Sequence, residues 1–179
     1  MSQNHIVGYL LSSFHFTINV SGLHLDFLGF ILIAAGLWQM ADKSAYFKNA
    51  IPWAIGRIAL SILPYIISLF ALPFEGVIFN FVAWADIAIT LYISYNIVAG
   101  VGDLQEQENL DLRYEKLNTV WTIHAVLTVV GSLLSYIHLD PIVAIAIPLV
   151  LIDTGIYIAF LVLLFKARTR YQSAPSYNA

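Results

Sequence analysis

Four ionisable side chains lie inside long apolar stretches of this sequence, and they limit what it can fold into more than any other feature. Arg57 and Asp86 are separated by 29 positions (86 − 57), and His124 and Asp153 are separated by the same number (153 − 124). The segments around them consist mainly of Ile, Leu, Val, Ala and Phe. Ionisable groups are costly in such surroundings and are kept there for pairing or for function. The pattern predicts apolar helices that enclose a polar interior.

Composition favours the bilayer as the solvent for these helices. Hydrophobic residues make up 60% of the chain and charged residues 11%, whereas about 25% of the residues in a typical soluble domain are charged. A membrane-spanning helix needs about 20 mainly apolar residues. Five segments meet or approach this length, and they are residues 26–41, 51–72, 77–99, 118–137 and 142–165. We therefore predict an all-α fold, a polytopic membrane helical bundle with five clear transmembrane helices.

Two parts of the chain allow alternatives. Residues 6–20 are apolar but short, so they predict either a sixth span or a re-entrant or interfacial helix. The polar run 104–117 predicts a short amphipathic helix on the membrane surface, or else a solvated connector, because Leu110, Tyr114 and Leu117 recur at helical spacing. We expect a single transmembrane domain over residues 1–170.

The positions of the basic residues predict an orientation. Lysine and arginine follow the first, third and fifth clear spans, at Lys43, Lys48, Arg113, Lys116, Lys166, Arg168 and Arg170. The alternate loops, residues 20–25, 73–76 and 138–140, contain neither. By the positive-inside rule the basic loops and the C-terminus are cytoplasmic. We expect the last basic cluster to end the final helix, residues 171–179 to form a disordered cytoplasmic tail, and Gly100 to Asp103 to end the third span.

Each ionisable side chain is followed by small or hydroxylated residues at helical spacing, which places a polar stripe on each of four helices. The candidate ligand- or ion-binding residues are Arg57, Asp86, His124, Asp153, Ser61, Tyr65, Thr90, Thr128, Tyr157 and Trp84. We predict that Arg57 pairs with Asp86 or Asp153, and that His124 pairs with whichever aspartate remains. Alternatively, Arg57 reaches the interface along its aliphatic stem, His124 is a neutral buried histidine, and the aspartates are protonated residues that join helices.

The two charged pairs also predict a duplicated hairpin. His124 and Asp153 lie 67 positions after Arg57 and Asp86 (124 − 57 and 153 − 86), and Thr128 lies 67 positions after Ser61. Two hairpins with this offset would share one topology and be related by an axis along the membrane normal.

Several classes of function are disfavoured. The net charge is −3 and no long basic tract exists, so nucleic acid is not an expected partner. The chain has no cysteine, and its five histidines show no i, i+4 pair. Nucleotide-binding and hydrolase motifs such as GxxxxGK[ST], GxGxxG and GxSxG are absent from the sequence. We expect no cofactor, no metal site and no catalytic residue.

Two resemblances bear on the class of protein. The stretch GLHLDFLGFILIAAGLWQMADKSAYFKNA, residues 22–50, resembles the opening of small uncharacterised multi-pass membrane proteins of Gram-positive bacteria. This resemblance implies a bacterial plasma membrane and no particular activity. In size and helix count the chain is also similar to the substrate-binding subunits of energy-coupling-factor vitamin importers. Residues 6–20 contain no alanine, unlike the first helix of those subunits, so no site residues are transferred.

Three functions are compatible with these observations. The first is binding or transport of a small-molecule solute or a proton by the charged intramembrane core. The second is a non-catalytic accessory or assembly subunit, with a partner membrane subunit or a second copy of the chain beside it. The third is an intramembrane enzyme that uses His124 with Asp86 or Asp153, and it ranks last because no nucleophile, metal site or phosphate motif accompanies the pair.

Overall fold

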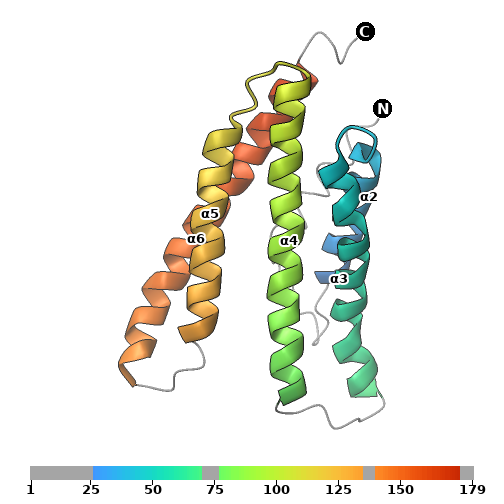
Figure 1. Cartoon of the computed structure of the whole chain (residues 1–179). Coiled ribbons are helices and arrows are strands. Elements are labelled where there is room, and N and C mark those ends of the chain that lie inside the picture. The colour runs from blue at the N-terminus through green and yellow to red at the C-terminus, as the bar shows by residue number, and fades with distance from the viewer. Residues whose placement is uncertain (1–25, 70–76, 135–139, 174–179) are drawn as a thin grey trace. The chain divides into compact units, whose positions relative to one another are not determined.

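The computed structural model describes residues 26–69, 77–134 and 140–173, and all regular structure in these ranges is helical. The five helices are α2 (Asp26–Met40), α3 (Ala45–Leu69), α4 (Val77–Gln107), α5 (Tyr114–Leu134) and α6 (Asp140–Gln172) (Figure 1). The prediction of an all-α fold is confirmed, and each of the five clear apolar segments contributes one helix. Residues 6–20 lie outside the described residues.

The chain divides into two compact units, Met1–Ile97 and Val98–Ala179. In the first unit α2 packs along α3, and Phe30, Leu37, Ala50 and Ala54 are buried. In the second unit α5 packs along α6, and Leu117, Phe160 and Leu161 are buried. Each unit therefore contains one of the two predicted hairpins with its charged pair. The single domain over residues 1–170 stays a prediction.

α3 begins earlier than expected. The apolar pattern predicted a start at residue 51, whereas the helix begins at Ala45. Ser44 is 5% exposed, and its Oγ accepts a hydrogen bond of 3.3 Å from the backbone N–H of Tyr46. A serine that caps the first free N–H groups in this way fixes the start of a helix. Hydropathy alone misses this start because Lys48 and Asn49 interrupt the apolar pattern near the beginning of α3.

α4 continues beyond the glycines that were expected to end it. The helix runs through Gly100 and Gly102 to Gln107, so the predicted stop at residues 100–103 is wrong. A Cβ atom at Gly102 would lie 2.8 Å from Cε2 of the Tyr114 ring. Gly102 therefore serves close contact between α4 and the start of α5. Because α4 ends at Gln107 and α5 begins at Tyr114, the separate amphipathic helix predicted over 104–117 is also wrong.

The basic residues near the C-terminus do not end α6. The helix passes Lys166, Arg168 and Arg170 and ends at Gln172, so that expectation is wrong. Long basic side chains are good helix formers and favour the last turns of a helix, where the carbonyl groups carry partial negative charge. Tyr171 and Gln172, which were assigned to the tail, belong to α6, and residues 174–179 lie outside the described residues.

Two helices of the described residues are long and apolar enough to cross a bilayer, namely Asn80–Gln107 and Tyr114–Leu134. Leu28–Met40 is a shorter apolar helix. By themselves these helices are weak support for membrane association, because the core helix of a soluble protein can have the same length and composition.

Candidate functional site

The first polar cluster is centred on Arg57 of α3. Its Nη1 lies 2.7 Å from Oδ1 of Asp86 on α4 and donates a second hydrogen bond of 2.7 Å to Oγ of Ser61. Its Nε donates to Oγ1 of Thr90 at 3.3 Å. The guanidinium carbon lies 4.4 Å from the centre of the Phe30 ring on α2. The side chain of Arg57 is 8% exposed and that of Asp86 is 32% exposed, so the cation is more deeply enclosed than its counter-ion.

Helical spacing places these partners. Ser61 follows Arg57 by four residues on α3, and Thr90 follows Asp86 by four residues on α4, so each pair lies on one helix face. Ser61 also donates from Oγ to the carbonyl oxygen of Arg57 at 2.9 Å, which fixes the hydroxyl that receives the guanidinium N–H. Sequence reasoning identified all four residues but missed Phe30, because cation–π contact with another helix leaves no spacing signal.

The second polar cluster is centred on His124 of α5. Its Nδ1 lies 2.8 Å from Oδ1 of Asp153 on α6. The imidazole ring lies 5.2 Å from the ring of Tyr157, at an interplanar angle of 38°. Tyr157 in turn stacks on Phe160 with 6.5 Å between ring centres. The side chains of His124 and Asp153 are 18% and 29% exposed, so this pair is half-buried.

The two clusters correspond position by position, although each lies within its own unit. The predicted pairing is confirmed, since Arg57 pairs with Asp86 and His124 with Asp153. The structure adds a further correspondence at the same offset of 67 (157 − 90), because Thr90 contacts Arg57 and Tyr157 contacts His124. Matched contacts at matched positions strengthen the duplication hypothesis beyond what the sequence alone supports.

The three other predicted site residues lie on α5, α4 and α3. Thr128, one turn after His124, has a buried Oγ1 that lacks a hydrogen-bond partner among the described residues. Its carbonyl oxygen accepts a hydrogen bond of 2.7 Å from Ser132. Trp84 lies on α4 two residues before Asp86 and is half-buried. Tyr65 belongs to α3, but its side chain lies outside the described part of the structure.

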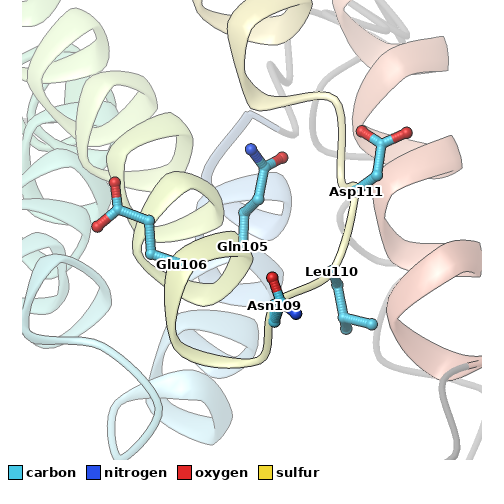
Figure 2. Close-up of a pocket in the computed structure, with 5 residues that line it drawn as sticks. All are labelled: Gln105, Glu106, Asn109, Leu110 and Asp111. Atoms are coloured by element: carbon cyan, nitrogen blue, oxygen red, sulfur yellow. The ribbon is translucent and has the colours of Figure 1, made fainter.

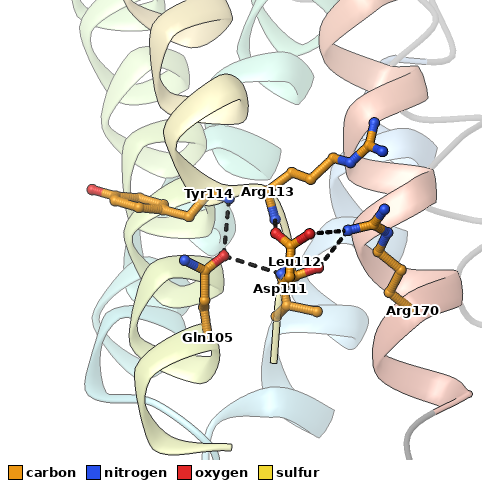
Figure 3. A network of polar contacts seen from close by, with 6 residues as sticks. All are labelled: Gln105, Asp111, Leu112, Arg113, Tyr114 and Arg170. Atoms are coloured by element: carbon orange, nitrogen blue, oxygen red, sulfur yellow. Dashed lines mark hydrogen bonds and ion pairs between the residues drawn. The ribbon is translucent and has the colours of Figure 1, made fainter. Parts of the chain in front are cut away.

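A third polar network, not predicted from the sequence, closes the turn between α4 and α5. Oε1 of Gln105 accepts hydrogen bonds from the backbone N–H groups of Leu112 and Tyr114, at 3.0 and 3.1 Å (Figure 3). Arg170 of α6 donates from Nη1 to the carbonyl oxygen of Asp111 at 2.7 Å and to its Oδ2 at 2.6 Å. This contact with Arg170 lowers the pKa of the Asp111 carboxyl below its usual value.

Two shallow surface hollows lie at the same turn. The larger, of about 450 Å³, is lined by Gln105, Glu106, Asn109, Leu110 and Asp111 (Figure 2). The second, of about 390 Å³, shares Gln105 and Asp111 with it and extends toward Lys116. Both are lined by residues of the turn and of the adjoining ends of α4 and α5, and by none of the predicted site residues. They are wide and exposed, so they do not resemble the enclosed pockets that hold small molecules.

No group of acidic or histidine side chains in the described residues is arranged to hold a metal ion. Each of the two charged pairs is a candidate site within its own unit. The chain matches no family model, no curated protein and no solved structure in the comparisons made. The resemblance of residues 22–50 to Gram-positive membrane proteins stays a prediction.

Proposed function

We propose that this chain is a multi-pass integral membrane protein that binds a small charged solute or a proton through its intramembrane charged pairs, in a process of transport. The observation that carries the proposal is the pair of aspartates, Asp86 and Asp153, each held by a basic side chain of a neighbouring apolar helix. Intramembrane carboxylates with basic partners are typical of solute, ion and proton sites.

Exposed apolar side chains support the membrane part of the proposal. Every described helix exposes large apolar residues, among them Trp38 at 69%, Phe81 at 73% and Leu151 at 68%. Soluble monomers rarely expose extended apolar patches of more than a few hundred Å². A bilayer covers such surfaces on all sides of a helix bundle, whereas a soluble partner covers one face.

The lengths of α4 and α6 support the proposal that they span a bilayer. At a rise of about 1.5 Å per residue, α4 is roughly 46 Å long and α6 roughly 50 Å long. Both exceed the hydrocarbon core of about 30 Å. Basic residues lie at or next to the turn between α4 and α5 and at the end of α6, among them Lys116 and Arg170. By the positive-inside rule we place both on the cytoplasmic side of a bacterial plasma membrane.

The absence of cysteine from the chain makes the topology directly testable. Single substitutions Lys43→Cys, Glu75→Cys and Ser173→Cys are labelled with a membrane-impermeant maleimide in intact and in permeabilised cells. The cysteine at 75 should react in intact cells, and those at 43 and 173 only after permeabilisation. Labelling of all three in intact cells would refute the proposed topology.

Solute or proton binding has its own test. Purified protein in liposomes is assayed for flux of protons and of the small molecules that co-purify with it, as identified by mass spectrometry. Flux and any ligand-dependent rise in melting temperature should disappear in Asp153→Asn. The conservative change Ser132→Ala is the matched control on α5, and it should keep both. An absence of flux and of ligand stabilisation in the native protein would count against the proposed function.

A second function is favoured by one observation on the first cluster. Arg57 donates to Asp86, Ser61 and Thr90 and stacks on Phe30, so the cation is already engaged by the protein. Such a saturated cluster suits a structural or assembly role, as in an accessory subunit of a membrane complex or a homo-oligomer. Co-purification of a partner chain that is lost in Phe81→Ser, on an exposed face of α4, would favour this alternative.

A further inference from the structure

The two charged pairs differ in whether they can exchange a proton. The guanidinium of Arg57 stays protonated throughout the physiological range, so the Arg57–Asp86 pair keeps one protonation state as long as it is intact. The second pair contains a histidine, and histidine is the residue type whose side chain ordinarily changes its charge near neutral pH. Matched positions of the two hairpins thus hold one permanent ion pair and one pair that can gain or lose a proton.

The hydrogen bond to Asp153 decides which imidazole nitrogen exchanges the proton. Nδ1 of His124 lies 2.8 Å from Oδ1 of Asp153, and a carboxylate at this distance holds the tautomer that carries hydrogen on Nδ1. Among the described residues, Nε2 of His124 has no hydrogen-bond partner. Nε2 is therefore the atom with a lone pair available.

We infer that the His124–Asp153 pair of the second hairpin is a proton-binding site in which Nε2 of His124 takes up and releases one proton. Before uptake the pair consists of a neutral imidazole and a carboxylate and carries a charge of −1. Uptake at Nε2 forms an imidazolium beside the carboxylate, and the pair becomes neutral. Release returns the proton from Nε2, while Nδ1–H stays bonded to Asp153.

The surroundings of His124 are suited to this exchange. The titratable side chains that contact it from α6 are Asp153 and Tyr157, whose ring is tilted by 38° relative to the imidazole. On α5 itself the nearest charged residues in sequence, Glu115 and Lys116, lie more than two turns earlier. The buried hydroxyl of Thr128, one turn along α5, is an unused donor and acceptor near the pair.

This inference rests on the proposed function and names its ligand as a proton. The test uses the full chain in lipid nanodiscs, labelled with ¹⁵N-histidine, and follows the imidazole nitrogens by NMR between about pH 5 and 9. His124→Gln identifies the signal, because the sequence contains four other histidines that stay as internal references. Ser132→Ala is the matched control on α5, since it leaves the four charged residues in place.

The expected result is a pH-dependent change in the His124 signals that is larger at Nε2 than at Nδ1, that is altered in Asp153→Asn, and that is the same in Ser132→Ala as in the native protein. His124 signals that stay constant over this range overturn the inference, and so does a pH dependence unaffected by Asp153→Asn. Either result leaves solute binding possible. Failure of the proposed function shows itself separately, as an absence of flux in liposomes.

Discussion

Removing the carboxylate from each charged pair should destabilise the protein by different amounts. Asp86→Asn leaves the guanidinium of Arg57, which is 8% exposed, without its counter-ion. Arg57 cannot lose its proton, so the charge stays. Asp153→Asn leaves His124 beside an amide oxygen that still accepts a hydrogen bond from Nδ1–H. Histidine can become neutral, which removes the electrostatic penalty.

The contacts set the size of each effect. Loss of one partner from a buried pair costs about 3–5 kcal/mol. Because Asp86 is 32% exposed and Arg57 keeps its hydrogen bonds to Ser61 and Thr90, we expect the lower end of this range, about 3 kcal/mol, for Asp86→Asn. For Asp153→Asn a neutral hydrogen bond replaces a charge-assisted one, at a cost of about 1 kcal/mol.

The assay is reversible unfolding by sodium dodecyl sulfate from a mild detergent, at neutral pH, followed by circular dichroism and by the fluorescence of the four tryptophans. Thr90→Val removes one hydrogen bond from Arg57 without removing the ion pair, and it should cost about 1 kcal/mol. The double variant Arg57→Met with Asp86→Leu removes both charges and should recover most of the stability that Asp86→Asn loses.

Equal losses of stability in Asp86→Asn and Asp153→Asn would refute this reasoning. They would mean that the ability of histidine to lose its charge does not affect the stability of its pair. A larger effect of Asp153→Asn would refute it more directly. A double variant no more stable than Asp86→Asn would show that the uncompensated charge on Arg57 is not the source of the loss.

Two further predictions concern the polar turn of the second unit. Gly102→Ala should destabilise the protein by about 1–2 kcal/mol through overlap with the ring of Tyr114, whereas Gly155→Ala, where a Cβ meets nothing within 4 Å, should be neutral or stabilising in the same unfolding assay. The Asp111 carboxylate stabilises the fold at pH values above 3.8, the usual pKa of this group, because its pKa is lowered in the folded state. The stability advantage of the native protein over Arg170→Gln should thus be present at neutral pH and disappear as the pH falls below that value, as measured by melting temperature against pH; an advantage that persists in acid would contradict it.

The sequence identified the four charged residues but left open whether Arg57 pairs with Asp86 or with Asp153, and the structure pairs the residues within each hairpin. Two helices joined by a short loop place residues equally distant from the loop opposite one another. Arg57 with Asp86 and His124 with Asp153 satisfy this condition with the same spacing of 29. Helical periodicity then added Ser61 and Thr90 without any knowledge of the packing.

The helix ends could not be predicted in the same way, because tertiary contacts determine them. Gly102 looked like a helix stop, but its missing side chain accommodates the ring of Tyr114. Gln105 looked like part of a solvated run, but its side chain accepts two backbone N–H groups that the turn leaves free. Composition describes a residue by itself, and both of these residues take their role from a partner that comes later in the chain.

One substitution, His124→Arg, gives the second cluster the basic residue type of the first. Ser61 and Thr128 occupy matched positions, yet only the hydroxyl of Ser61 receives a hydrogen bond from the basic residue one turn earlier. The side chain of arginine is longer than that of histidine, and its guanidinium has five N–H donors, so Arg57 reaches both the carboxylate of Asp86 and the hydroxyl of Ser61. His124→Arg should therefore pair with Asp153 and donate to Thr128, which satisfies a buried hydroxyl that otherwise lacks a partner.

His124→Arg should keep the fold, with a stability within about 1 kcal/mol of the native protein, because the new hydrogen bond offsets the loss of contact with Tyr157. It should also abolish proton uptake by the second pair, since arginine stays protonated. Loss of uptake is measured directly by counting the protons that the unbuffered variant releases when the pH is raised, and by comparing this number with that of the native protein. Retained uptake in a folded His124→Arg variant would show that another group carries the proton, and unfolding of the variant would show that the two hairpins are not built on one plan.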